Sequence, residues 1–78
     1  MWIRFKAGGR ETIMEFDKVS AYKDEIAIVT LRETIRLKFT STSEAESCMY
    51  NNIYRGIYEG CRIIDISNKE IIGLTHRE

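Results

Sequence analysis

Residues 43–59 read SEAESCMYNNIYRGIYE, and no other stretch of the chain repeats apolar side chains at helical spacing over several turns. Four apolar residues follow one another at intervals of four positions: Ala45, Met49, Ile53 and Ile57. That spacing places them along one side of an α-helix. The segments before and after alternate apolar and polar side chains, as strands do. We therefore expect one long helix whose apolar side packs on the face of a sheet.

Capping signals set the ends of this helix. Two pairs at its start have the spacing of a capping box: Ser41 with Glu44, and Ser43 with Glu46. Either serine can accept a hydrogen bond from a backbone N–H of the first turn. Gly60 follows the helical stretch, and glycine adopts the left-handed conformation that ends helices at little cost. The helix is therefore predicted to begin at one of these serines and to end just before Gly60.

A hairpin is predicted at the N-terminal end. Gly8 and Gly9 favour a two-residue type I′ turn, because both central residues of such a turn need a positive φ. Pairing outward from this turn separates an apolar side from a charged side, which fixes the register of a half-buried sheet. On the apolar side Met1, Ile3 and Phe5 lie opposite Phe16, Met14 and Thr12. On the charged side Trp2, Arg4 and Lys6 lie opposite Glu15, Ile13 and Glu11.

A second hairpin is predicted within residues 26–39. Apolar side chains alternate through residues 26–31 and again through residues 34–39. A two-residue loop at Arg32 and Glu33 places the apolar residues of both segments on one face. The facing pairs are then Ile26 with Phe39, Ile28 with Leu37, and Thr30 with Ile35. Arginine and glutamate do not favour a type I′ turn, so a loop longer by one or two residues is the alternative.

The remaining segments have weaker patterns. Residues 17–25 fit a short strand or a turn, residues 61–66 predict a strand because they are rich in β-branched side chains, and residues 71–74 fit a last short strand or irregular packing. Residues 75–78 are expected to be a frayed tail. The predicted fold is one small α+β domain, residues 1–78: an antiparallel β-meander of about four strands, one long helix packed on one sheet face, and one or two C-terminal strands.

Composition narrows the classes of function and location. Lys and Arg together number 12, as do Asp and Glu, and the two signs are interspersed. Net charge therefore gives no argument for binding nucleic acid or an anionic membrane. The N-terminal residues lack the apolar core of a signal peptide, and no stretch approaches the roughly 18 apolar residues of a membrane helix. We expect a cytoplasmic protein without a membrane partner, whose two cysteines are reduced.

Residues suited to catalysis or metal binding are few. The soft ligand candidates are Cys48, Cys61 and His76, and their spacing matches no zinc pattern. Nucleophilic catalysis needs a base beside the nucleophile, and the single histidine lies in the predicted tail. Gly8 and Gly9 are not followed by the helix and lysine of a phosphate-binding loop. The sequence therefore predicts no enzyme, no cofactor and no metal site.

Tyrosines on the helix give the best candidate for a binding surface. Tyr50, Tyr54 and Tyr58 recur every four residues and form a second stripe, rotated outward from the predicted buried one. Tyrosine is enriched in protein interfaces. With Arg55, these residues predict a site for a protein partner or for a second copy in a homodimer, as in a small regulator or inhibitor that occupies a partner's surface. The alternative is that the tyrosines border the core.

Nucleic-acid binding is the rival prediction. Trp2, Arg4 and Lys6 share one strand face, and Arg36 and Lys38 share another, expected on the same side of the sheet. Aromatic and basic side chains on a sheet hold single strands by stacking and phosphate contacts. Against this interpretation, acidic residues of the neighbouring strand face the first three.

Overall fold

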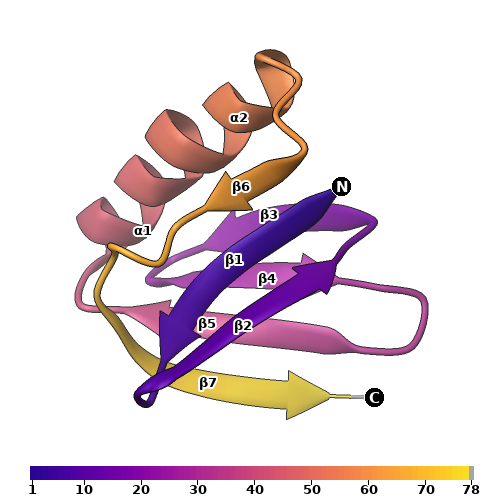
Figure 1. The fold of residues 1–78 in the computed structure, drawn as a ribbon. Coiled ribbons are helices and arrows are strands. Elements are labelled where there is room, and N and C mark those ends of the chain that lie inside the picture. The colour runs from indigo at the N-terminus through magenta and orange to yellow at the C-terminus, as the bar shows by residue number, and fades with distance from the viewer. Residues whose placement is uncertain (78) are drawn as a thin grey trace.

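The computed structural model describes residues 1–77 and contains two sheets and one helix (Figure 1). The N-terminal strands are β1 (Trp2–Ala7), β2 (Arg10–Glu15), β3 (Lys18–Tyr22), β4 (Glu25–Val29) and β5 (Thr34–Phe39). The helix comprises α1 (Thr42–Cys48), the π-helical segment η1 (Met49–Tyr54) and α2 (Arg55–Tyr58). Two strands follow it, β6 (Ile63–Asp65) and β7 (Ile71–Arg77). The predicted α+β fold, with a strand meander, one helix and C-terminal strands, is confirmed, and the meander has five strands.

The meander is divided between the two sheets. Sheet A has the order β2-β1-β6 and sheet B the order β3-β4-β5-β7. The chain crosses between them after β2: the Phe16 N–H donates to the Met1 carbonyl of sheet A at 2.9 Å, and the Asp17 N–H donates to the Val29 carbonyl of sheet B at 2.8 Å. Strand β6 pairs in parallel with β1, while every other recorded pairing within residues 1–77 is antiparallel.

The first hairpin has the predicted register. Ile3 pairs with Met14 and Lys6 pairs with Glu11. Gly8 and Gly9 have φ values of +60° and +77°, as a two-residue type I′ turn requires. Strand alternation and turn chemistry specify the same pairing here, so this prediction is confirmed.

The loop of the second hairpin is two residues longer than the predicted two-residue loop, which confirms the longer-loop alternative. Ile26 pairs with Leu37 and Ile28 with Ile35, which leaves a four-residue loop, Thr30 to Glu33. The Thr30 hydroxyl accepts hydrogen bonds from the backbone N–H groups of Arg32 and Glu33 at 3.3 and 3.1 Å, and the Thr30 N–H donates to the Glu33 carbonyl at 2.9 Å. A shift of two residues keeps each side chain on its predicted face.

Strand β7 corrects the expectation of a frayed tail. Thr75, His76 and Arg77 continue this strand and pair with Arg36, Ile35 and Thr34 of β5. Backbone pairing with β5 therefore orders the part of the predicted tail that the structure describes, and Glu78 lies outside the described residues.

The helix begins and ends where its capping signals predict. The Ser41 hydroxyl accepts a hydrogen bond from the Glu44 N–H at 3.1 Å and is the N-cap. Gly60 has φ +74°, and its N–H donates to the Ile57 carbonyl at 3.1 Å. Of the two candidate capping boxes, the structure uses the first serine.

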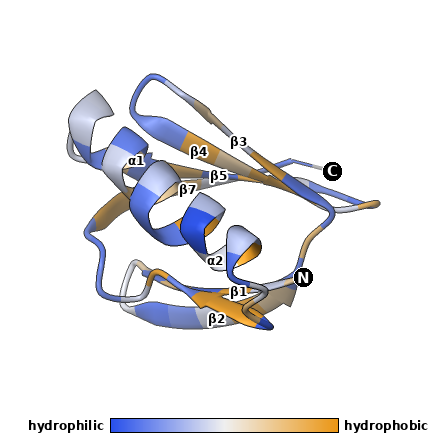
Figure 2. Ribbon diagram, turned by 90° about the horizontal axis from the view of Figure 1, so that it is seen from above, coloured by the Kyte–Doolittle hydropathy of each residue, from blue (hydrophilic) through white to orange (hydrophobic). Residues whose placement is uncertain are grey.

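The core lies between the two sheets, and the helix covers one open side of it (Figure 2). Both sheets and the helix contribute fully buried side chains, including Ile3, Phe5, Ile26, Leu37, Met49 and Ile53. Within residues 1–77, no helix is both long enough and apolar enough to cross a membrane. The inward sides of the strands are thus occupied by packing, and their outward sides remain for function.

Ile57 departs from the predicted buried stripe. Ala45, Met49 and Ile53 are at most 1% exposed, but Ile57 is 40% exposed. In the α-helical segment α2 each residue is turned about 100° from the one before it, so Ile57 is rotated away from the core when its neighbour Gly56 takes the inward position. Gly56 faces the core instead, where a Cβ would lie 3.0 Å from Ile64 Cγ1.

Candidate functional site

The outer side of the helix carries a strip of exposed apolar side chains, which we call the tyrosine face: Tyr50, Tyr54, Ile57 and Tyr58. Their exposed fractions are 62%, 46%, 40% and 92%. The rings of Tyr50 and Tyr54 meet edge to face, with centroids 5.4 Å apart and an interplanar angle of 68°. The tyrosines thus lie outside the core, and the strip is held in shape by the helix.

Charged and polar groups beside the tyrosine face have partners within the helix. Arg55 Nε lies 3.6 Å from Glu59 Oε1, one turn further on. Asn51 Nδ2 donates to Ser47 Oγ at 3.2 Å. Arg55, predicted to contact a partner, is therefore engaged by a neighbouring carboxylate, and the tyrosine face itself carries no formal charge.

The outer face of sheet A holds the first three predicted nucleic-acid residues, Trp2, Arg4 and Lys6. Arg4 Nη2 lies 2.7 Å from Glu11 Oε1, and Arg4 Nη1 lies 3.5 Å from Asp65 Oδ2. Lys6 pairs across the hairpin with the same Glu11. Two carboxylates thus engage Arg4, and Lys6 lies opposite a residue that already pairs with Arg4.

Asp65 is fixed by more than its arginine neighbour. The hydroxyl and the backbone N–H of Ser67 donate to Asp65 Oδ1 at 2.6 and 2.9 Å. These two hydrogen bonds, and to a smaller degree the charge of Arg4, lower the pKa of the Asp65 carboxyl, against a weak opposing effect of burial. Asp65 therefore stays ionised and holds Arg4 in place.

The outer face of sheet B holds the other two predicted residues, Arg36 and Lys38. Their carboxylate neighbours are distant: Arg36 Nη1 lies 4.0 Å from Glu25 Oε1, and Lys38 Nζ lies 3.9 Å from Asp24 Oδ2. The predicted nucleic-acid residues do not form one surface, because the outer faces of the two sheets point away from a shared core. The expectation of a common side is wrong, since a single continuous sheet was assumed.

Three basic residues and one aromatic residue on the same side of sheet B were not predicted as site residues. The strand register places Lys18 and Arg77 in one row across the sheet and Tyr22 in the row of Lys38. The loop residue Arg32 borders that surface beside Arg36 and Arg77. The alternation in residues 18–22 was the available signal, but that strand was too weakly marked to be placed.

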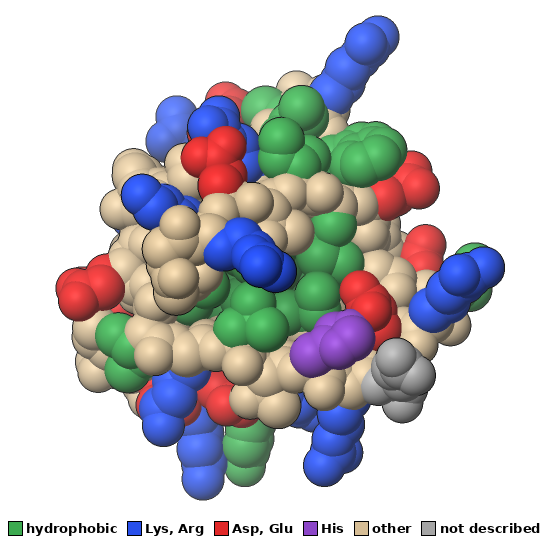
Figure 3. Space-filling model, turned by 60° about the horizontal axis from the view of Figure 1, so that its bottom comes forward, with side chains coloured by type: hydrophobic (Ala, Val, Ile, Leu, Met, Phe, Trp, Pro, Cys, Tyr) green, Lys and Arg blue, Asp and Glu red, His purple; other side chains and the backbone are tan. Residues whose placement is uncertain are grey.

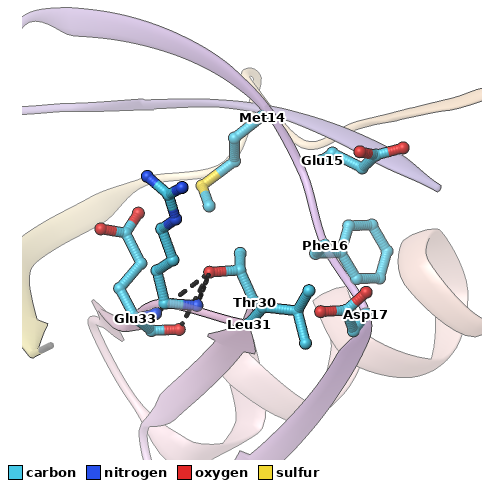
Figure 4. Close-up of a pocket in the computed structure, with 8 residues that line it drawn as sticks. Met14, Glu15, Phe16, Asp17, Thr30, Leu31 and Glu33 are labelled. Atoms are coloured by element: carbon cyan, nitrogen blue, oxygen red, sulfur yellow. Dashed lines mark hydrogen bonds between the residues drawn. The ribbon is translucent and has the colours of Figure 1, made fainter.

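A shallow pocket of about 390 Å³ opens where β2 ends and faces the loop between β4 and β5 (Figure 4). Met14 and Phe16 give it an apolar side, and its rim carries charges of both signs, from Arg32 and from Glu15, Asp17 and Glu33. Within residues 1–77 no group of three His, Cys, Asp or Glu side chains is placed to hold a metal ion.

A wider groove of about 610 Å³ runs between the edge strands β2 and β7, and apolar side chains gather in a hollow on this side of the molecule (Figure 3). Phe5, Thr12 and Ile35 line it. Leu74 also lines the groove and is 48% exposed, although it pairs with the fully buried Leu37. The groove marks where the two sheets diverge. His76 pairs with Ile35 near the groove's end, and its Nε2 contacts Glu33 Oε2.

The two cysteines occupy different environments, and both are free thiols. Cys48 is fully buried on the inner side of the helix, and Cys61 is exposed after the helix ends. Burial raises the pKa of the Cys48 thiol to about 11; the charge of Lys69 lowers this pKa and that of Glu44 raises it, both by smaller amounts. Cys48 is thus a core residue.

The chain matches no protein-family model, and comparisons with curated proteins and with solved structures found no match.

Proposed function

We propose that this chain is a small non-enzymatic protein-binding module whose contact surface is the tyrosine face, and that its simplest partner is a second copy of itself. The observation that carries the proposal is the exposure of three tyrosines and Ile57 on one side of a helix whose other side is fully buried. A surface of this kind suits a regulator or inhibitor that acts by covering a partner's surface.

The chemistry of these side chains favours a protein partner. A tyrosine offers a large apolar ring, a polar hydroxyl and few rotatable bonds, so ordering it at an interface costs little entropy. Contiguous exposed apolar groups on a folded domain mark interaction sites more often than isolated ones do. Here the contiguous groups are Tyr50, Tyr54 and Tyr58, on adjacent turns.

The spacing of the tyrosines favours a second copy as the occupant. Tyr54 lies midway between Tyr50 and Tyr58, so the stripe reads the same in both directions. Two helices that pack antiparallel about a two-fold axis at Tyr54 would set Tyr50 of each copy against Tyr58 of the other, as an isologous interface requires. No like charges meet along the stripe, because Arg55 and Glu59 pair within one helix.

The size of the tyrosine face sets the expected strength of the dimer. Stable dimers bury about 800 Å² per partner, and one short helical face supplies less than that. We expect a reversible dimer with a dissociation constant on the order of micromolar.

Sedimentation equilibrium over a range of concentrations tests the proposal. The wild-type chain is expected to pass from monomer to dimer, and the double substitution Tyr54→Ser with Tyr58→Ser is expected to remain monomeric with a nearly unchanged melting temperature. Tyr22→Ser is the matched control, since Tyr22 is 68% exposed on the outer face of sheet B. Its dimerisation should equal that of the wild type.

Two results would count against the proposal. A strict monomer at high concentration would remove the dimer. A large loss of stability in the Tyr54 and Tyr58 variant would show that the rings support the core. For a different protein partner, a photo-crosslinking residue at position 58 should form adducts in extract that the same residue at position 22 does not.

A further inference from the structure

We propose a second binding surface, separate from the tyrosine face: the outer face of sheet B binds single-stranded nucleic acid, with one phosphate held in a pocket lined by Arg32, Arg36 and Arg77. The ligand class follows from charge, small side chains between the charged ones and one exposed aromatic ring, all placed by the register of four strands. This inference does not depend on the proposed dimer.

The outward side chains of sheet B form three rows across its strands. Reading from β3 through β4 and β5 to β7, the rows are Lys18, Val29, Thr34, Arg77; then Ser20, Ala27, Arg36, Thr75; then Tyr22, Glu25, Lys38, Gly73. Four of these residues are cations and one is an acid, in a chain whose formal net charge is zero. The charge of the molecule is therefore unevenly distributed, and this face attracts anions.

A pocket of about 320 Å³ lies at the end of this face, beside the loop between β4 and β5. Three arginines, Arg32, Arg36 and Arg77, are among the residues that line it, together with Thr34. Arginine presents paired N–H donors that match phosphate oxygens, and several arginines around one space are typical of phosphate recognition. Glu33 also lines the pocket, but its carboxylate contacts His76.

The cations of this face are loosely held, unlike those of sheet A. Arg36 and Lys38 lie 4.0 and 3.9 Å from their carboxylates, whereas Arg4 on sheet A lies 2.7 Å from Glu11. Breaking a long, half-exposed ion pair costs little. Arg36 and Lys38 can therefore turn to a phosphate without leaving a tightly bonded carboxylate unpaired.

Small side chains on the outer face of sheet B, together with one exposed aromatic ring, favour a single-stranded nucleic acid over other polyanions. Small side chains at Ser20, Ala27 and Gly73 separate the cations, so a strand can lie along the sheet. Tyr22 is 68% exposed in the same row as Lys38, and Lys23 Nζ lies 5.4 Å from its ring centroid. Stacking on a tyrosine needs a base that is free of a complementary strand, and this is how sheet faces hold single strands.

Fluorescence anisotropy with a labelled oligothymidylate at low salt tests this site. We expect binding that weakens with salt, with a slope of about 0.7 per phosphate neutralised. Arg36→Gln combined with Arg77→Gln should weaken binding about tenfold and reduce that slope. Glu25→Gln should strengthen binding, because it removes the acid among the four cations. The emission of Trp2, on sheet A, should not change.

Matched controls locate the site. Arg4→Gln combined with Lys6→Gln removes two cations from the outer face of sheet A and should leave affinity unchanged. If circular dichroism shows that the Arg36 and Arg77 variant is unfolded, Lys18→Gln, at an exposed position, replaces it as the variant that should weaken binding. The proposal is overturned if oligothymidylate does not bind at low salt, if the sheet A control weakens binding equally, or if vesicles containing phosphatidylserine bind while the oligonucleotide does not.

Discussion

Apolar residues are buried on one side of the helix and exposed on the other. Both sheets cover the inner side, which consists of Ala45, Cys48, Met49, Ile53 and Gly56. The tyrosine face carries large apolar side chains that are exposed to water. The difference shows that apolar content alone does not identify the core of so small a domain. The side of the helix on which a residue lies decides whether its side chain stabilises the fold or remains available for a partner.

The sharpest way to break this comparison is the same substitution on each side. Ile53→Ala should lower the free energy of unfolding by about 2–5 kcal/mol, because a fully buried side chain leaves a cavity. Ile57→Ala, one turn further on, should cost less than about 1 kcal/mol, since Ile57 is already partly in water. Urea unfolding of both variants measures the two values. Equal losses would show that the two sides are not distinct.

Gly56 lies at a close contact between the helix and β6 and gives a second test of this comparison. Alanine has the higher helix propensity by about 1 kcal/mol, but its Cβ would lie 3.0 Å from Ile64 Cγ1, and Ile64 is 3% exposed. We expect Gly56→Ala to destabilise the fold by about 1 kcal/mol net, as overpacking does.

A double-mutant cycle isolates this contact. Ile64→Ala removes the crowded atoms, so Gly56→Ala should be stabilising in that background, and the two changes should be non-additive. A Gly56→Ala variant more stable than the wild type would mean that Ile64 and β6 can shift to accommodate the added methyl group at little energetic cost.

A pH dependence also reports on the inner side of the helix. Burial raises the pKa of Cys48 to about 11, whereas an unfolded thiol titrates near 8.5. The folded state therefore binds this proton more tightly, and stability should fall as pH rises from about 8.5 to 11. Unfolding curves across this range should have a shallower pH slope for Cys48→Ala than for the wild type.

Cys61→Ala provides the control for this titration, because Cys61 is exposed beyond the end of the helix. Its pH slope should match that of the wild type. If Cys48→Ala and the wild type show the same slope, the Cys48 thiol is in contact with water in the folded state.

Local sequence signals predicted the parts of the fold that neighbouring residues determine. Gly8 and Gly9 fix a turn, and alternation on both sides fixes one register, so the first hairpin was predictable residue by residue. Ser41 and Gly60 set the helix ends through their own backbone contacts. In each case the relevant interaction spans only a few residues of chain.

Features that depend on distant contacts were not predictable. The crossing between sheets at Phe16 and Asp17, where the chain bends, has no sequence pattern of its own. The exposure of Ile57 depends on the helix phase relative to two sheets. The arginine pocket combines residues of one loop and two strands, and so required the full register.

The position of β6 and β7 has a consequence for how the molecule comes apart. These strands follow one another after the helix, yet β6 completes sheet A and β7 completes sheet B. Loss of either strand exposes a hydrogen-bonding edge in its own sheet. It also releases one end of the short segment that connects β6 to β7. The segment after the helix therefore links the two layers, and we expect them to unfold in one transition.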